Sequence, residues 1–306
     1  SGGSISKIAA MKNAVGNFID QVTANATGDP ATNEDDVTHR IGIVKFSGNE
    51  SDQIGNDTYR SDGNTYNYSQ AVQDLTSVTG NVQSLKNAVN ELAAAGSTRT
   101  DFGLNQAQRV LDGDWQHGLG GAREEAKQVV VVFTDGEPST FSNWSGGVAA
   151  NAVNLAKDLK DDKVTVYTIG MFEDADPSDT DGRFNKYMNG VSSNYPNAEV
   201  TNWRGDRTQD WDDCKLGTRV TEGNYYFAAD DAEELENAFS TIADNVSTSK
   251  VAAGANTVLS DTLSEFFTFP EGLTGSSDGG MVQYAEVKGQ DADGSYTWYE
   301  PEALTG

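Results

Sequence analysis

The chain has 306 residues and a formal net charge of −26, because 47 acidic residues outnumber 21 basic ones. Such a charge argues against a nucleic-acid partner, since proteins that bind phosphate backbones carry basic surfaces. A single cysteine, Cys214, excludes an intrachain disulfide, and no run of about 18 apolar residues predicts a membrane-spanning helix.

Helical and extended patterns alternate along the first 248 residues. Apolar residues at helical spacing predict helices over 7–22, 82–92, 101–111, 148–161, 184–191 and 232–246. Apolar, β-branched runs predict strands over 41–46, 68–78, 128–134, 164–170 and 225–229, with long polar loops over 47–65 and 173–183. This order predicts an α/β fold with a doubly wound, mainly parallel sheet flanked by helices.

The texture changes after about residue 248. Helical periodicity stops, and short apolar runs such as Phe266–Phe269 and Tyr296–Trp298 stand between Gly, Asp and Pro turns. We therefore divide the chain into an α/β domain over 1–248 and the start of a β-rich stalk module over 249–306, which is too short to be complete.

The run Gln128–Thr134 is wholly apolar and β-branched in its centre and ends at Asp135-Gly136. It predicts a strand buried on both faces. Its carboxyl end is where open α/β sheets bind ligands. If this strand runs toward Asp135, the helix 101–111 runs away from the same edge, so Thr98 and Asp135 converge there.

At Val131-Val-Phe-Thr-Asp-Gly-Glu-Pro138 the sequence resembles the von Willebrand factor A domain. Further stretches resemble the family's first helix, second strand, threonine loop and next core strand, in the family's order: Ser6–Val15, Ile41–Phe46, Gly96–Thr98 and Val164–Gly170. The resemblance covers roughly residues 1–248. It implies a metal-ion-dependent adhesion site that holds Mg²⁺, or Mn²⁺, with Thr98 and Asp135 among the ligands.

The family also draws ligands from an Asp-x-Ser-x-Ser motif after its first strand. Residues Ser1–Ser6 contain serines but no aspartate, and we interpret them as the linker that follows the motif. The family's first strand, which lies between 41–46 and 128–134, is then missing too. Because its absence would expose Val and Ile side chains at roughly 1.5–3 kcal/mol each, we expect an N-terminally truncated fragment of a longer protein.

Structural interpretations compete for the same residues. Asp135 is also typical of an Asp-Gly turn, and Thr98 of a helix cap. Thr100 is a rival for the threonine ligand, and Glu137 is interpreted as a solvated or supporting group. The acidic loops 47–65 and 173–183 are interpreted as solvated, with a second cation as the alternative.

Two further stretches, Tyr187–Pro196 and Asp261–Phe267, look similar to large surface proteins of Gram-positive bacteria. This resemblance implies an extracellular, wall-anchored or pilus setting. We expect a non-enzymatic, cation-dependent adhesion module for a protein ligand, with host matrix proteins such as collagen among the candidates, and without direct membrane insertion.

Three alternatives stay open. The first is a structural stalk or pilus component with a vestigial metal site. The second is an α/β hydrolase, and the third is an intracellular chelatase-type subunit. The enzyme alternative is weakened because the chain has neither a phosphate-binding Gly-rich loop nor a Gly-x-Ser-x-Gly elbow, and its two histidines, His39 and His117, are poorly placed.

Overall fold

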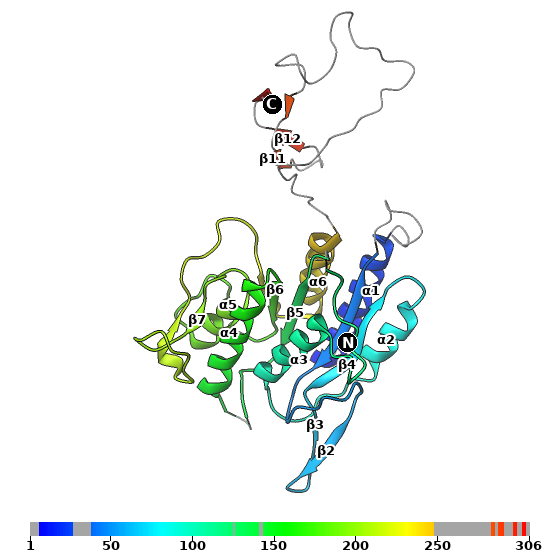
Figure 1. The fold of residues 1–306 in the computed structure, drawn as a ribbon, viewed down its shortest axis with the longest axis vertical. Coiled ribbons are helices and arrows are strands. Elements are labelled where there is room, and N and C mark those ends of the chain that lie inside the picture. The colour runs from blue at the N-terminus through cyan, green and yellow to red at the C-terminus, as the bar shows by residue number, and fades with distance from the viewer. Residues whose placement is uncertain are drawn as a thin grey trace, which may run out of the picture. The chain divides into compact units, whose positions relative to one another are not determined.

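The computed structural model describes residues 6–26, 38–124, 126–140 and 143–247, together with four short strands between residues 283 and 303 (Figure 1). The chain divides into two compact units, Ser1–Ser249 and Lys250–Gly306. Ser1–Ile5, interpreted above as a linker, lie outside the described residues.

The helices of the first unit are α1 (Lys7–Ala24), α2 (Val82–Asn90), α3 (Thr100–Asp112), α4 (Gly146–Asp161), α5 (Arg183–Val191) and α6 (Ala232–Ser247). Its strands are β1 (Arg40–Lys45), β2 (Thr58–Ser61), β3 (Asn64–Asn67), β4 (Gln70–Ser77), β5 (Val129–Thr134), β6 (Thr165–Gly170), β7 (Glu199–Val200), β8 (Cys214–Lys215) and β9 (Tyr226–Ala228). The α/β alternation predicted from the sequence is confirmed, with ends shifted by at most two residues.

The strands of the first unit pair in two principal groups. Strands β5, β6 and β9 form a parallel sheet in that order, and β1 pairs with β4 in antiparallel fashion. Among the described residues, no strand pairs with the edge of β5 that lies opposite β6. The doubly wound sheet therefore consists of two separate pieces.

Helices cover both faces of these sheets. On one face α1 packs against α6, with Phe18 and Phe239 in edge contact at 5.9 Å (Figure 1). On the other face α3 and α4 pack together, and α4 also contacts α5. The largest apolar cluster lies on this second face, where Val132 and Val166 of the sheet meet Ala152 and Val153 of α4.

Strand β5 is less buried than its sequence predicts. Val132 and Thr134 are buried, but Val129, Val131 and Phe133 are only half-buried. The prediction of a strand buried on both faces is therefore wrong in part. The physical reason is the unpaired edge, because a strand without a neighbour on one side leaves the flanks of its side chains uncovered.

A hairpin, β2–β3, begins within the region 47–65 that we predicted as a long polar loop and extends to Asn67. Tyr59 lies opposite Tyr66, and their rings stack with centroids 5.4 Å apart. Asp62 and Gly63 form the turn, both with positive φ. An Asp-Gly pair flanked by Tyr and Thr residues is a hairpin signal, so the sequence did contain this information.

The irregular region 194–222 folds back over α4 and α5. Strand β7 pairs with β8, and Cys214 in β8 is buried within the largest core cluster. The side chain of Lys160, on α4, is also buried and donates hydrogen bonds to the carbonyls of Gly190, Ser192 and Tyr195 at 2.8, 3.2 and 3.0 Å. These carbonyls lie at and beyond the end of α5, so Lys160 closes that end of the helix.

The second unit contains four described strands. β10 (Gln283–Tyr284) pairs with β13 (Glu302–Ala303), and β11 (Val287–Gln290) pairs with β12 (Tyr296–Trp298), both antiparallel. The remainder of the predicted β-rich module, including Phe266–Phe269 and Asp261–Phe267, lies outside the described residues.

Candidate functional site

The loop before α3 and the loop after β5 meet at one edge of the sheet. Ser139 N–H donates a hydrogen bond to the Thr98 carbonyl at 3.0 Å, and Thr98 N–H donates to Ser139 Oγ at 3.2 Å. Ser97 Oγ adds a bond to the Thr140 carbonyl at 2.5 Å. We call the surface formed by Gly96–Arg99 and Asp135–Ser139 the rim.

The Thr98 side chain lies close to the Asp135 turn. A Cβ atom built on Gly136 would lie 3.6 Å from Thr98 Oγ1. The Thr98 hydroxyl thus points at the backbone of the residue that follows Asp135. Thr98 and Asp135 are 37 residues apart in the sequence. Their proximity at the rim accords with the topology inferred from the sequence.

Both side-chain groups at this point are available. Asp135 is exposed, Thr98 is half-buried, and neither the carboxylate nor the hydroxyl bonds to another group within the described part of the chain. The turn itself is held by Thr134, whose Oγ1 donates to the Gly136 carbonyl at 2.8 Å. Asp135 is therefore not needed as a hydrogen-bond acceptor in its own turn.

The other carboxylates near the rim have partners. Glu137 forms a bidentate ion pair with Arg183 at 3.0 Å, and Arg99 clamps Asp101 with two bonds of 2.9 Å. Glu50 accepts from the amide of Asn105 at 2.7 Å. Asp135 differs from all of these carboxylates, because its charge is uncompensated by the described residues.

Thr100, the rival for the threonine position, is turned inward. It is 1% exposed, and its Oγ1 makes no hydrogen bond to any described residue. The geometry thus places Thr98 at the surface of the rim and Thr100 in the core. The alternative interpretation of Thr98 as a side-chain cap is not supported, because Arg99 occupies the N-cap position of α3 and makes no side-chain cap bond.

A hard divalent cation suits this pair of oxygens. Mg²⁺ takes oxygen ligands, keeps several waters and is bound through one or two carboxylates. A carboxylate and a hydroxyl that are both free within the described residues, on loops that meet at the rim, offer oxygen ligands of this kind. Within the described ranges, however, no cluster of three or more Asp, Glu, His or Cys side chains could hold a metal, so Asp135 is the charged ligand on which such a site depends.

Two carboxylates of the acidic loop 173–183, Asp176 and Asp179, bond within the loop and to its neighbouring helix. Asp176 Oδ1 accepts from the backbone and hydroxyl of Ser178, at 2.8 and 2.7 Å, and this bonding lowers the Asp176 pKa. Asp179 Oδ1 accepts from the Gly182 and Asp181 amides, each at 2.9 Å, which lowers the Asp179 pKa. These contacts are those of a self-ordered loop.

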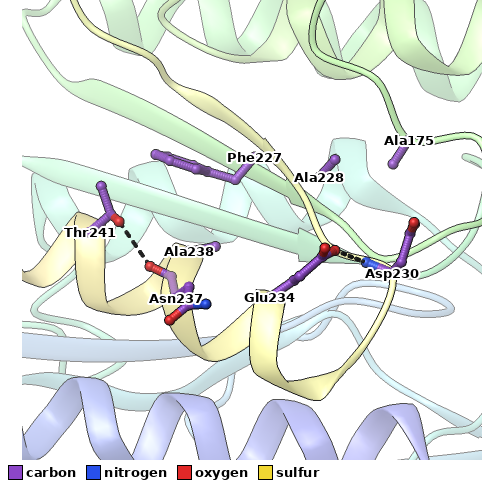
Figure 2. Close-up of a pocket in the computed structure, with 8 residues that line it drawn as sticks. All are labelled: Ala175, Phe227, Ala228, Asp230, Glu234, Asn237, Ala238 and Thr241. Atoms are coloured by element: carbon purple, nitrogen blue, oxygen red, sulfur yellow. Dashed lines mark hydrogen bonds between the residues drawn. The ribbon is translucent and has the colours of Figure 1, made fainter.

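Two cavities of about 470 Å³ each flank the sheet. One opens beside the start of α3, where Glu50, Asp101, Phe102 and Asn105 face Asn151 and Gln209. The other lies between β9 and α6, on the far side of β6 from β5. Figure 2 shows Phe227 and Ala228 of β9 on one side and Glu234, Asn237, Ala238 and Thr241 of α6 on the other, with Asp230 between the two elements. The polar groups in this second cavity serve α6 itself: Asp230 N–H donates to Glu234 at 2.8 Å, and Thr241 Oγ1 to the Asn237 carbonyl at 2.9 Å.

Sequence reasoning missed two supports of the rim. Ser139 lacks a distinctive pattern, because its role depends on the fold bringing it to Thr98. Arg183 pairs with Glu137 and lies over the ring of Trp144 at 5.1 Å, and Trp144 contacts Trp211 at 5.3 Å. The sequence does not indicate which of the 21 Lys and Arg residues forms the ion pair with Glu137.

No helix among the described residues is long and apolar enough to cross a membrane. Comparison with curated proteins finds no match. Among solved structures, the open conformation of the pilus adhesin SpaC from Lactobacillus rhamnosus GG is 17% identical, with a TM-score of 0.46 over 79% of this chain and 28% of the SpaC chain. The chain therefore spans well under half of the length of that protein.

Two other solved structures are similar at the same level. Proximal thread matrix protein 1 from the mussel byssus, with a zinc-occupied MIDAS motif, is 15% identical with a TM-score of 0.39, over 78% of this chain and 42% of that chain. Manganese-loaded TRAP protein of Plasmodium vivax is 18% identical with a TM-score of 0.37, over 74% of this chain and 63% of that chain.

A family model matches residues 1–204, which is two thirds of the sequence and includes the rim, the parallel strands β5 and β6 and the helices α1 to α5. On this match the chain belongs to the family of von Willebrand factor type A domains.

Proposed function

We propose that the domain is a divalent-cation-dependent module that binds a protein ligand, and that it belongs to an extracellular surface protein. Thr98 and Asp135 would hold Mg²⁺ or Mn²⁺ at the rim. The single observation that carries the proposal is that the Asp135 carboxylate and the Thr98 hydroxyl, on loops that meet at the rim, are both unpartnered within the described part of the chain, whereas the other rim carboxylate, Glu137, is paired with Arg183.

The chemistry favours a ligand that brings a carboxylate. One protein carboxylate leaves a divalent cation with net positive charge, so an acidic side chain of a partner can complete the shell. The contribution of this chain is to hold the hydroxyl and the carboxylate in place. Ser139 fixes the Thr98 backbone, and Thr134 fixes the Asp135 turn.

The surroundings of the rim suit a protein ligand better than a small molecule. Asp135 of the rim and the adjoining Thr140 are both exposed. The cavity beside α3 is lined by amide side chains, carboxylates and Phe102. A partner side chain entering this cavity would add contact area beyond the cation. Host matrix proteins such as collagen and fibrinogen-like proteins are the class that we propose to test.

The proposal assigns no catalytic role to the domain. The two histidines lie away from the rim, His117 beside Asp114 beyond the end of α3 and His39 just before β1. Neither can act as a base for a nucleophile at the rim. A structural stalk or pilus component with a vestigial metal site is the second candidate, favoured by the single free carboxylate among the described rim residues.

The test is a Mn²⁺ titration followed by water proton relaxation, with Mg²⁺ as competitor. A chain of net charge −26 attracts divalent cations everywhere, so matched variants are essential. Asp135→Ala and Thr98→Ala remove the proposed ligands. Asp112→Ala removes an exposed carboxylate at the other end of α3, which bonds to no described residue, and serves as the control.

We expect one saturable site that Mg²⁺ competes for, lost in Asp135→Ala, weakened in Thr98→Ala and kept in Asp112→Ala. Circular dichroism establishes that each variant is folded. If Asp135→Ala and Asp112→Ala bind Mn²⁺ alike, the cation site is refuted, and the structural stalk becomes the better account. With the site established, binding to immobilised collagen and fibrinogen is compared in Mg²⁺ and in EDTA.

A further inference from the structure

Strand β9 ends the parallel sheet, and a cavity lies beside it. The sheet order is β5, β6, β9, and no strand within the described ranges pairs with the side of β9 opposite β6. The cavity of about 470 Å³ is lined by β9, α6, the turn between them and Ala175 of the loop after β6. We call this cavity, together with the open edge of β9, the edge groove.

The register of β9 shows which backbone groups face its open edge. The Tyr225 carbonyl and the Ala229 N–H both bond to β6, at 2.8 and 3.0 Å. In a parallel pair, successive residues direct their N–H and C=O groups to alternate sides, so Phe227 also faces β6. The N–H and C=O groups of Tyr226 and Ala228 therefore face the open edge. An edge of this kind accepts the main chain of another extended segment.

The side chains of the edge groove are apolar near the strand. Phe227 of β9 is half-buried, Ala238 of α6 is buried, and both face the cavity (Figure 2). A segment lying beside β9 would cover the Phe227 ring and remove it from water. The Asn237 side-chain amide lines the same cavity and bonds to no other described group, so it is available to bond the main chain of an occupant.

One end of the edge groove is strongly acidic. Asp230 and Glu234 lie at this end of the cavity and Thr241 at the other (Figure 2). With Asp231 and Glu233, they place four exposed carboxylates at the start of α6, and none of the four forms an ion pair with a described residue. The positive end of the helix supplies only about half an elementary charge, so this end stays negative.

We propose that the edge groove binds an extended, basic segment of a partner protein, which adds a strand beside β9. Main-chain bonds to Tyr226 and Ala228 hold the segment, an apolar side chain covers Phe227, and a Lys or Arg side chain pairs with Asp230 or Glu234. An acidic segment is repelled at one end, and a helical segment leaves the strand edge unpaired. This surface is separate from the rim and does not depend on the proposed cation site.

The experiment uses the whole chain and a capped peptide of about six Val, Thr and Lys residues. One control peptide carries Glu in place of each Lys. A second control keeps the sequence but has N-methylated amides, which remove the N–H donors that strand pairing requires. All titrations contain EDTA, so their outcome is independent of the cation site. Hydrogen exchange is measured at Tyr226, Phe227 and Ala228, and calorimetry gives the peptide affinity.

Matched variants locate the charge that the peptide recognises. Asp230→Asn with Glu234→Gln removes both carboxylates of the edge groove, and the Gln retains an oxygen that can accept from the backbone N–H of residue 230. Glu233→Gln removes a carboxylate from the same turn of α6 that does not line the cavity, and serves as the control. Circular dichroism establishes that each variant is folded.

We expect the Lys peptide at saturation to slow exchange at Tyr226 and Ala228 by about tenfold, with little change at Phe227, which already faces β6. The double variant should bind about threefold more weakly or worse, and Glu233→Gln should bind like the wild type. Unchanged exchange at Tyr226 and Ala228 would refute the groove as an acceptor of strands.

The controls supply further outcomes that would overturn the proposal. Equal binding of the N-methylated peptide would exclude strand pairing, and equal binding of the Glu peptide would exclude the preference for a basic segment. Slow exchange at Tyr226 and Ala228 in the chain without peptide would show that the edge is already occupied. An increase of that protection with protein concentration would assign the edge to a second copy of the chain.

Discussion

Thr98 and Ser139 exchange hydrogen bonds in both directions, N–H to carbonyl at 3.0 Å and N–H to hydroxyl at 3.2 Å, although 41 residues separate them. This pair holds the threonine loop against the loop after β5. The relative position of Thr98 and Asp135 thus depends on a residue that is not itself a proposed ligand.

Replacing Ser139 with Ala should weaken the cation site without removing a ligand. Ser139 is 7% exposed and Thr98 is half-buried, so the Thr98 N–H loses its acceptor in a partly buried place, at a cost of about 1 kcal/mol. We expect a roughly 10-fold or larger loss of Mn²⁺ affinity, as for other residues that orient metal ligands. Ser145→Ala, which removes the N-cap of α4, is the control: similar destabilisation with unchanged Mn²⁺ binding. Equal Mn²⁺ affinity in the two variants would contradict the positioning role.

Two glycines within helices should respond oppositely to Ala. Gly16 in α1 has no atom within 4 Å of the position that a Cβ methyl would take, so Gly16→Ala should stabilise the domain by about 0.5–1 kcal/mol through helix propensity. Gly103 in α3 would place its methyl 2.8 Å from Phe46, so Gly103→Ala should destabilise by about 1–3 kcal/mol through overpacking. Urea unfolding measures both, and a stabilising Gly103→Ala would show that Phe46 moves aside freely.

Lys160 should make stability depend on pH above neutrality. Burial lowers the pKa of Lys160 to about 7, against 10.5 for the free side chain. Between these values the unfolded chain binds the extra proton, so this residue's contribution to stability increases as pH rises from 7 toward 10.5. Urea unfolding of the wild type and of Lys160→Met should be measured across this pH range. We expect the free energy of unfolding of the wild type to increase with pH relative to that of the variant.

At about pH 7 the same variant should already be less stable, by about 2–4 kcal/mol, because three buried carbonyls lose their donor. A constant difference between the two proteins from about pH 7 to about pH 10 would mean that the lysine stays charged. Lys157→Met, on the same helix but paired with Asp161 at the surface, controls for the loss of a positive charge.

Asp114 should make the stability of the fold depend on pH in the acid range. Hydrogen bonds from Arg109 at 2.5 Å and His117 at 2.7 Å hold the pKa of Asp114 at about 2. A lowered carboxyl pKa stabilises the fold above the ordinary value of 3.8, and this effect is lost as pH falls through about 2. Asp114→Asn should therefore lower the melting temperature at about pH 5 to 7, and the difference should shrink between about pH 4 and 2. A difference that persists at low pH would point to packing of the loop.

The sequence carried the order of helices and strands because apolar periodicity is a local property. Asp135 could be placed at the carboxyl edge of the sheet because it ends an apolar strand, and Thr98 at the same edge because it precedes a helix directed away from that edge. Ser139, Arg183 and Lys160 were not identifiable, because each acts through partners far along the chain. The partial exposure of β5 was also missed. An apolar run shows that a strand favours a buried environment, but it does not show which strands pair with it.

The buried Cys214 can serve as an internal probe of local opening of the domain. Its thiol is the one sulfhydryl in the sequence, it is 6% exposed, and burial raises its pKa to about 11. A thiol reagent at neutral pH reacts with the thiolate form of an accessible cysteine, so labelling must wait for β8 to open away from the core. The rate of labelling by such a reagent is then a direct reading of how often this part of the domain opens, taken on the unmodified chain and without a denaturant.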